Sequence, residues 1–98
     1  MLLVCMNSKQ RRTFTAIFSK PPPKTLLWRD IESLFRALGC EVVERGGSRV
    51  SFRYAIQYED KADDVAQGDF HRPHPGKEAK PYQVRKAADF LAKIGRLP

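Results

Sequence analysis

Residues 25–39, TLLWRDIESLFRALG, carry the pattern that most constrains how this chain can fold. Apolar residues recur there every three or four positions, as along one face of an α-helix, and polar residues occupy the opposite face. The apolar positions are Leu27, Trp28, Ile31, Leu34, Phe35 and Leu38. Thr25 is placed to cap the start of this helix, and Gly39 is placed to end it. We therefore expect an amphipathic helix whose Trp28 and Phe35 belong to the hydrophobic core.

Two short segments after this helix alternate in the way that β-strands do. CEVVE at 40–44 and RVSFRY at 49–54 are separated by RGGS, a glycine-rich sequence suited to a hairpin turn. Successive side chains of a strand point to opposite faces, so the second strand has one apolar face and one basic, polar face. The apolar face holds Val50, Phe52 and Tyr54, and the polar face holds Arg49, Ser51 and Arg53. We expect the apolar face in the core and the polar face in solvent.

The C-terminal half predicts one more strand and one more helix. Residues 55–68 are acidic and are expected to form an exposed loop, followed by a short strand at 69–72, DFHR. In this strand Phe70 would join the core, and His71 would lie on the basic face of the sheet. The segment 81–95, PYQVRKAADFLAKIG, has helical spacing, begins with a proline and ends with a glycine.

These elements divide the chain into an appendage and one main domain. Residues 1–24 contain a short helical pattern, Ser8–Phe18 with Ser8 as its cap, and then three prolines that break any helix. We interpret them as an N-terminal appendage and a proline linker. Residues 25–98 predict an α+β domain in the order helix, strand, strand, strand, helix. Its two helices would pack on one face of a three-stranded antiparallel sheet.

The charge of the chain limits its partners. Lys and Arg number 18 against 11 Asp and Glu, which gives a formal net charge of +7. A small domain this basic is expected to bind a polyanion: nucleic acid, an acidic protein or an anionic membrane surface. The apolar start MLLVCM precedes the basic residues, the wrong order for a signal peptide, and no segment is long enough to span a bilayer. We expect a cytoplasmic protein without membrane contacts. The number and spacing of Cys5 and Cys40 predict no disulfide scaffold, metal or cofactor.

The only two histidines lie in FHRPHPGKEAKP, residues 70–81. Imidazole can take up and release a proton near neutral pH, and basic side chains beside it can hold a charged substrate. His71 and His74 are therefore catalytic candidates. The residues expected to bind RNA phosphates are Arg49, Ser51, Arg53, Arg72, Lys77 and Lys80. A simpler interpretation is that the histidines only shape a proline-rich turn, and residue types alone leave both open.

The order of these motifs resembles the HicA family of toxins, small basic proteins of toxin–antitoxin pairs. The resemblance rests on ALGCEVVERGGSRVSFRY followed by FHRPHPGKEAKPYQVRKAADFLAKIG, and it covers most of the chain from residue 25 onwards. It implies a fold like that of the double-stranded-RNA-binding domain. It also implies ribosome-independent and metal-independent cleavage of messenger RNA (mRNA interferase activity), and an inhibitory antitoxin partner of the HicB type.

One position departs from the family pattern. Family members carry the proposed catalytic histidine directly after Gly-Ser, whereas here Arg49 follows Gly47 and Ser48. Arginine stays protonated and cannot take a proton from a hydroxyl. Two hypotheses follow. Either His71 or His74 carries the chemistry of a HicA-type endoribonuclease, or the chain is a non-catalytic RNA-binding or protein-interaction module on the same fold.

Overall fold

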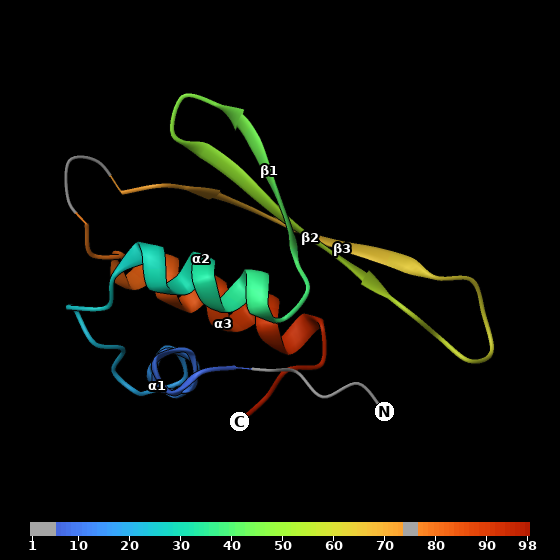
Figure 1. The fold of residues 1–98 in the computed structure, drawn as a ribbon, viewed down its shortest axis with the longest axis horizontal. Helices are drawn as coiled ribbons and strands as arrows, with labels where there is room; N and C mark the ends of the chain where they lie inside the picture. The colour runs from blue at the N-terminus through green and yellow to red at the C-terminus, as the bar shows by residue number, and fades with distance from the viewer. Residues whose placement is uncertain (1–5, 74–76) are drawn as a thin grey trace.

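The computed structural model describes residues 6–73 and 77–98 and shows three helices and three strands. In chain order they are α1 (Ser8–Ile17), α2 (Trp28–Ala37), β1 (Glu41–Gly46), β2 (Arg49–Ile56), β3 (Asp64–His71) and α3 (Pro81–Lys93). The strands form one antiparallel sheet in the order β1-β2-β3. Helices α2 and α3 lie side by side on one face of this sheet (Figure 1). The predicted α+β fold, with an α-β-β-β-α core like that of the double-stranded-RNA-binding domain, is confirmed.

An aromatic cluster fills the space between the sheet and the helices. Phe35 of α2 lies 4.6 Å from Phe52 of β2 and 5.5 Å from Phe90 of α3, measured between ring centroids. Trp28 packs 5.5 Å from Phe70 of β3. All five rings are buried, so the prediction that Trp28 and Phe35 belong to the core is confirmed. Edge-to-face and offset-stacked contacts of this kind add to the stabilisation gained by burying the rings.

Gly68 allows α3 to approach the sheet closely. A Cβ atom added there would lie 2.9 Å from Cδ1 of Phe90 and 3.1 Å from Cε1 of Phe70. Any larger residue would therefore push α3 away from β3. Gly68 was expected in the acidic loop, but it lies within β3, where its missing side chain makes room for a core aromatic ring.

Helix α1 forms a third layer on the side of α2 and α3 that faces away from the sheet (Figure 1). Ile17 is buried in the core cluster, and the side-chain amide of Gln10 donates to Ser33 Oγ of α2 at 2.9 Å. The predicted helix is confirmed, but its predicted cap is wrong. Asn7 is the N-cap, because its side-chain oxygen accepts the Gln10 amide proton at 2.8 Å. The domain boundary at residue 24 stays a prediction.

The predicted cap of α2 is also wrong. The N-cap is Leu27, which offers no side-chain acceptor, and Thr25 lies outside the helix. The start of α2 is instead held by a short bridge to the segment before α3. Trp28 donates its backbone N–H to the carbonyl of Lys77 at 2.9 Å, and Ala79 donates to the carbonyl of Leu26 at 2.7 Å.

The acidic segment contains more strand than its composition predicts. β2 continues to Ile56 and β3 already begins at Asp64, so the expected loop at 55–68 shrinks to residues 57–63. The extra residues form a two-stranded ribbon that projects beyond the helices (Figure 1). Aspartate and glycine have weak strand propensity, but pairing with β2 outweighs it here. The backbone hydrogen bonds of the ladder stabilise the strand whichever side chain each residue carries.

None of the helices in the described part of the chain combines the length and the hydropathy needed to cross a membrane.

Candidate functional site

The sheet face that α2 and α3 leave uncovered, here called the open face, carries the predicted basic residues. His71 of β3 pairs in register with Arg49 of β2, so their side chains leave the sheet on the same side. Directly opposed residues of an antiparallel pair have Cβ atoms roughly 4.5–5.5 Å apart. Both residues are exposed. The predicted placement of His71 on the face of Arg49 is confirmed.

A cavity of about 440 Å³ lies around this pair. Strands β1, β2 and β3 and helix α3 all contribute to its wall. The lining residues are Arg45, Arg49, Val50, Ser51, Gln67, Asp69, Phe70, His71 and Lys86. Cationic side chains thus converge on one exposed imidazole. Such a site can hold an anion next to a group that accepts or donates a proton.

Hydrogen bonds fix the polar floor of the cavity. Arg45 Nε donates to Ser51 Oγ at 3.0 Å, and the Ser51 hydroxyl donates to Asp69 Oδ1 at 2.6 Å. The Gln67 amide donates to the same carboxylate oxygen at 3.0 Å. The Ser51 bond, followed by that of Gln67, lowers the pKa of Asp69 below its ordinary value, because both stabilise the ionised carboxylate. Ser51, predicted to bind RNA, is buried and uses its hydroxyl within this network.

Helix α3 closes the cavity at the outer edge of β3. The ammonium group of Lys86 contacts the backbone carbonyl of Asp69 and lies 5.0 Å from the centroid of the Phe70 ring. One turn earlier, the buried Gln83 donates from its side-chain amide to the His71 carbonyl at 2.5 Å. The backbone of His71 is therefore tied to α3, and the ammonium group of Lys86 is held beside the cavity.

Arg72 makes a different set of contacts from the other predicted phosphate ligands. Its guanidinium binds both carboxylate oxygens of Glu44, at 2.6 and 2.7 Å, and donates from Nε to Glu32 at 2.7 Å. The same Glu32 oxygen accepts the indole N–H of Trp28 at 2.8 Å. The Glu44 and Glu32 hydrogen bonds raise the pKa of Arg72, and the Arg72 bond lowers the pKa of Glu44. Arg72 thus links β1 and α2 to the end of β3.

The structure separates the predicted site residues into two groups. Arg49, Ser51 and His71 lie together in the cavity. Arg53 lies on the same open face next to it, opposite Gln67 in the β2–β3 ladder. Lys77 and Lys80 are exposed in the segment before α3 and do not line the cavity. His74 lies outside the described residues.

Four polar or charged residues of the cavity were not predicted as site residues from the sequence. They are Arg45, Gln67, Asp69 and Lys86. The alternation that placed His71 on the open face also places Asp69 there, two residues earlier, so this signal was present. A register irregularity between Glu44 and Gly46 obscures the position of Arg45, and Lys86 enters through the packing of α3 on β3.

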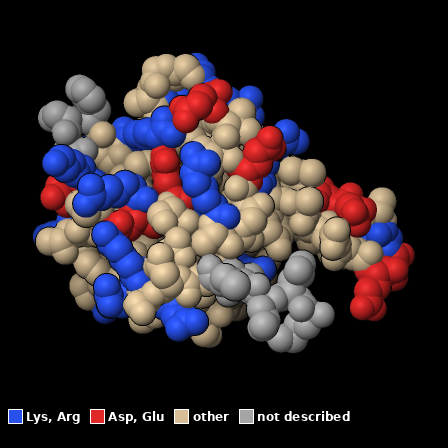
Figure 2. Space-filling model, viewed as in Figure 1, with Lys and Arg blue, Asp and Glu red and all other residues tan. Residues whose placement is uncertain are grey.

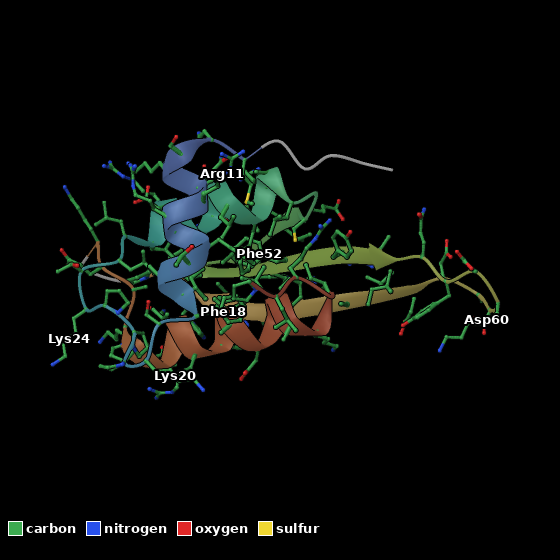
Figure 3. All side chains as sticks on the ribbon, turned by 90° about the horizontal axis from the view of Figure 1, so that it is seen from below. Arg11, Phe18, Lys20, Lys24, Phe52 and Asp60 are labelled. Atoms are coloured by element: carbon green, nitrogen blue, oxygen red, sulfur yellow. The ribbon has the colours of Figure 1, made fainter. Side chains whose placement is uncertain are left out.

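Figure 2 shows that the acidic side chains of the ribbon tip gather at one end of the molecule. They come from Glu59, Asp60, Asp63 and Asp64. Asp60 marks this tip, at the opposite end of the molecule from Lys24 (Figure 3). The acidic part of the chain is thus kept away from the cationic cavity.

Comparison with known proteins identifies the family. The family model described as HicA toxin of bacterial toxin-antitoxin matches residues 28–95, from the start of α2 to the glycine after α3. Neither the curated proteins nor the solved structures gave a match. The match covers more than half of the chain and includes the whole α-β-β-β-α core with its cavity. This chain belongs to the HicA toxin family.

Proposed function

We propose that this chain is the RNA-cleaving toxin of a toxin–antitoxin pair, a metal-independent endoribonuclease with His71 as its acid–base group. Membership of the family implies an RNA target and a cognate antitoxin in general. The observation that carries the finer proposal is the pairing of His71 with Arg49 across the β2–β3 ladder, inside a cavity that Arg45 and Lys86 also line.

The pairing of His71 with Arg49 suggests how the chain could keep a catalytic imidazole although Arg49 stands where the family pattern has histidine. In the family pattern that this chain resembles, the histidine follows Gly-Ser, at the position held here by Arg49. His71 leaves the sheet from the neighbouring strand on the same side, roughly 4.5–5.5 Å away between Cβ atoms. An imidazole at either position reaches the same volume. We infer that His71 supplies the imidazole and that Arg49 supplies a phosphate-binding cation.

The proposed reaction uses the RNA's own 2′-hydroxyl as nucleophile. The neutral imidazole of His71 takes the hydroxyl proton as the 2′-oxygen attacks the phosphorus, and the bond from phosphorus to the 5′-oxygen breaks. The leaving 5′-oxygen takes a proton from a general acid, and we assign this role to His74, the second of the two predicted acid–base candidates. The products are a 2′,3′-cyclic phosphate and a free 5′-hydroxyl. Arg45, Arg49 and Lys86 offset the negative charge that the phosphate gains in the transition state.

An end-labelled RNA incubated with the protein in EDTA tests this function. Wild type is expected to cleave and to leave 2′,3′-cyclic phosphate ends. His71→Ala is expected to slow cleavage by about 10²–10⁴-fold, the usual contribution of a general base, while RNA binding persists. His74→Ala and the double variant test the predicted acid. Unchanged circular dichroism and melting temperature would show that each variant is folded. Cleavage that survives in the double variant would contradict the proposal.

Arg49 also favours a second candidate function, a non-catalytic RNA-binding or protein-interaction module, because it replaces the residue that the family uses for chemistry. Such a module would bind RNA with a strong dependence on salt, since neutralised phosphates release counterions, and would cleave nothing. Salt-dependent binding by wild type without any cyclic phosphate product would select this function over the first.

The antitoxin is proposed to cover the open face. An acidic partner seated on the cavity would contact Arg45, Arg49 and Arg53 and would exclude RNA simply by occupying its site. Charge reversal in Arg49→Glu and Arg53→Glu is then expected to weaken the complex with the antitoxin, measured by co-purification. Arg11→Glu on α1, in the layer farthest from the sheet, is the matched control. Equal weakening by all three variants would contradict this arrangement.

A further inference from the structure

A carboxylate lies inside the cationic cavity, and the reaction proposed above makes no use of it. Asp69 lines the cavity together with Arg45, Arg49 and Lys86. A negative charge beside a bound phosphate repels it, so a cavity that only held phosphates would be better without Asp69. An ionised carboxylate only accepts hydrogen bonds, so the ligand group that would suit Asp69 is a hydrogen-bond donor.

The structure holds Asp69 in a fixed orientation. Its Oδ1 accepts from Ser51 at 2.6 Å and from Gln67 at 3.0 Å, and Ser51 is itself held by Arg45 Nε at 3.0 Å. The Ser51 side chain is only 1% exposed, so this chain of bonds starts from a rigid point in the sheet. Within residues 6–73 and 77–98, no donor contacts the second carboxylate oxygen, Oδ2. One oriented acceptor therefore stays available to a ligand.

The size and spacing of the cavity suit a nucleotide. Its volume of about 440 Å³ falls within the range of roughly 300–1,000 Å³ that is typical of small-ligand sites. Asp69 and His71 lie two residues apart on the same side of β3, which separates them by roughly 6.7 Å along the strand. A phosphate held by Arg49 and His71 can therefore place an adjoining base next to Asp69 and Gln67.

We propose that Asp69 recognises the exocyclic amino group of a base next to the scissile phosphate, and so favours cytosine, adenine or guanine over uracil. This inference rests on the proposed RNA-cleaving function and adds a specificity-determining residue to it. Carboxylates accept hydrogen bonds from base amino groups such as cytosine N4. Uracil presents a carbonyl oxygen at the same place, which repels the carboxylate.

The test uses DNA oligonucleotides that carry a single ribonucleotide. Only a ribonucleotide has the attacking 2′-hydroxyl, so cleavage is confined to one known bond. One series compares ribocytidine with ribouridine at that position, and a second compares deoxycytidine with deoxyuridine as its 3′ neighbour. Wild type is expected to have a higher kcat/KM for the cytosine substrate in one series, by about 10–150-fold, which corresponds to the roughly 1.5–3 kcal/mol of one hydrogen bond to a charged group.

Asp69→Asn separates recognition from a structural role. The asparagine keeps an oxygen for Ser51 and adds an amide donor, so the preference for cytosine over uracil is expected to fall or to reverse. Asp60→Asn removes the same charge at the ribbon tip and is expected to keep the wild-type preference (Figure 3). If Asp69 served only the fold, Asp69→Asn would slow both substrates equally and leave their ratio unchanged, which would overturn the inference.

Failure of the proposed function gives a different result from failure of this inference. Cleavage of both bases at equal rates in both series would leave the nuclease intact and would overturn base recognition. If no substrate is cleaved, the nuclease proposal fails. The affinity of the protein for the uncleaved oligonucleotides, measured by fluorescence anisotropy, then tests base recognition by Asp69 on its own. Tighter binding of the cytosine oligonucleotide, lost in Asp69→Asn, would support recognition by Asp69, and equal affinities would overturn it.

Discussion

Arg49 and His71 face each other across the β2–β3 ladder, on the open face of the sheet that α2 and α3 leave uncovered. This pairing places a permanent cation next to a group that can exchange a proton. Three of the four elements of the core that follow α2 contribute to it: β2 and β3 carry the two residues, and α3 holds the backbone of His71 through Gln83. The geometry of the cavity thus depends on how α3 packs against β3.

The hydrogen bonds from Arg72 to Glu32 and Glu44 predict that replacing Arg72 lowers the stability of the fold rather than its affinity for RNA. Arg72→Ala leaves the half-buried Glu32 without its charged partner. The free energy of unfolding, measured with urea, is therefore expected to fall by about 1–3 kcal/mol. Arg53→Ala removes an exposed arginine that makes no such bonds to the residues described by the structure, so it is expected to change stability little. The predicted phosphate-binding role would instead appear as a smaller salt dependence of RNA affinity in Arg72→Ala. That result, with unchanged stability, would contradict the structural role.

The Ser51 hydrogen bond predicts the titration of Asp69. Because this bond lowers the pKa of Asp69 below its ordinary value of 3.8, Ser51→Ala is expected to raise the pKa of Asp69, as measured by NMR titration of the carboxyl carbon. Ser48→Ala in the exposed β1–β2 turn is the control. A group with a lowered pKa in the folded state stabilises the fold above its unfolded pKa. This contribution is lost as the pH falls below 3.8 through the folded value. An unchanged pKa in Ser51→Ala would contradict this account.

Burial predicts an unreactive Cys40. Desolvation raises the pKa of this thiol from 9.0 to about 11, against a smaller opposing effect of the Arg96 charge. In a Cys5→Ser background, Cys40 is expected to react with a thiol reagent slowly in the native protein and fast in urea. The raised pKa also stabilises the fold below pH 9, and this contribution is lost as the pH rises from 9 through about 11. Fast labelling of the native protein would show that Cys40 is not protected.

The buried face of α1 predicts that the N-terminal appendage stabilises the fold. Ile17 is 2% exposed, so Ile17→Ala is expected to cost about 2–5 kcal/mol, as other large-to-small changes in cores do. Thr15→Ala on the exposed face of α1 is the control. A fragment of residues 25–98 is expected to keep its circular dichroism and to unfold cooperatively at a lower temperature. Non-cooperative unfolding of the fragment would show that the proposed boundary at residue 24 is wrong.

Local patterns predicted the helices well, and non-local pairing explains what they missed. The spacing in 25–39 and 81–95 is a property of each segment alone, so both helices were found. The start of β3 was missed because residues 64–68 become a strand only through their ladder with β2. Lys86 was missed for the same kind of reason, since only the packing of α3 on β3 brings it to the cavity. The position of Asp69 could have been predicted, because the same strand alternation that places His71 on the open face also places Asp69 there.

The most direct test of the central claim exchanges the position of the histidine. His71→Ala is expected to slow RNA cleavage in EDTA by about 10²–10⁴-fold. Adding Arg49→His, which restores an imidazole on the facing strand, is expected to recover part of the lost rate with the same 2′,3′-cyclic phosphate product. Arg49→His alone shows whether the arginine is also needed. Recovery in the double variant would establish that positions 49 and 71 serve one catalytic volume. Undiminished cleavage by His71→Ala would contradict the account.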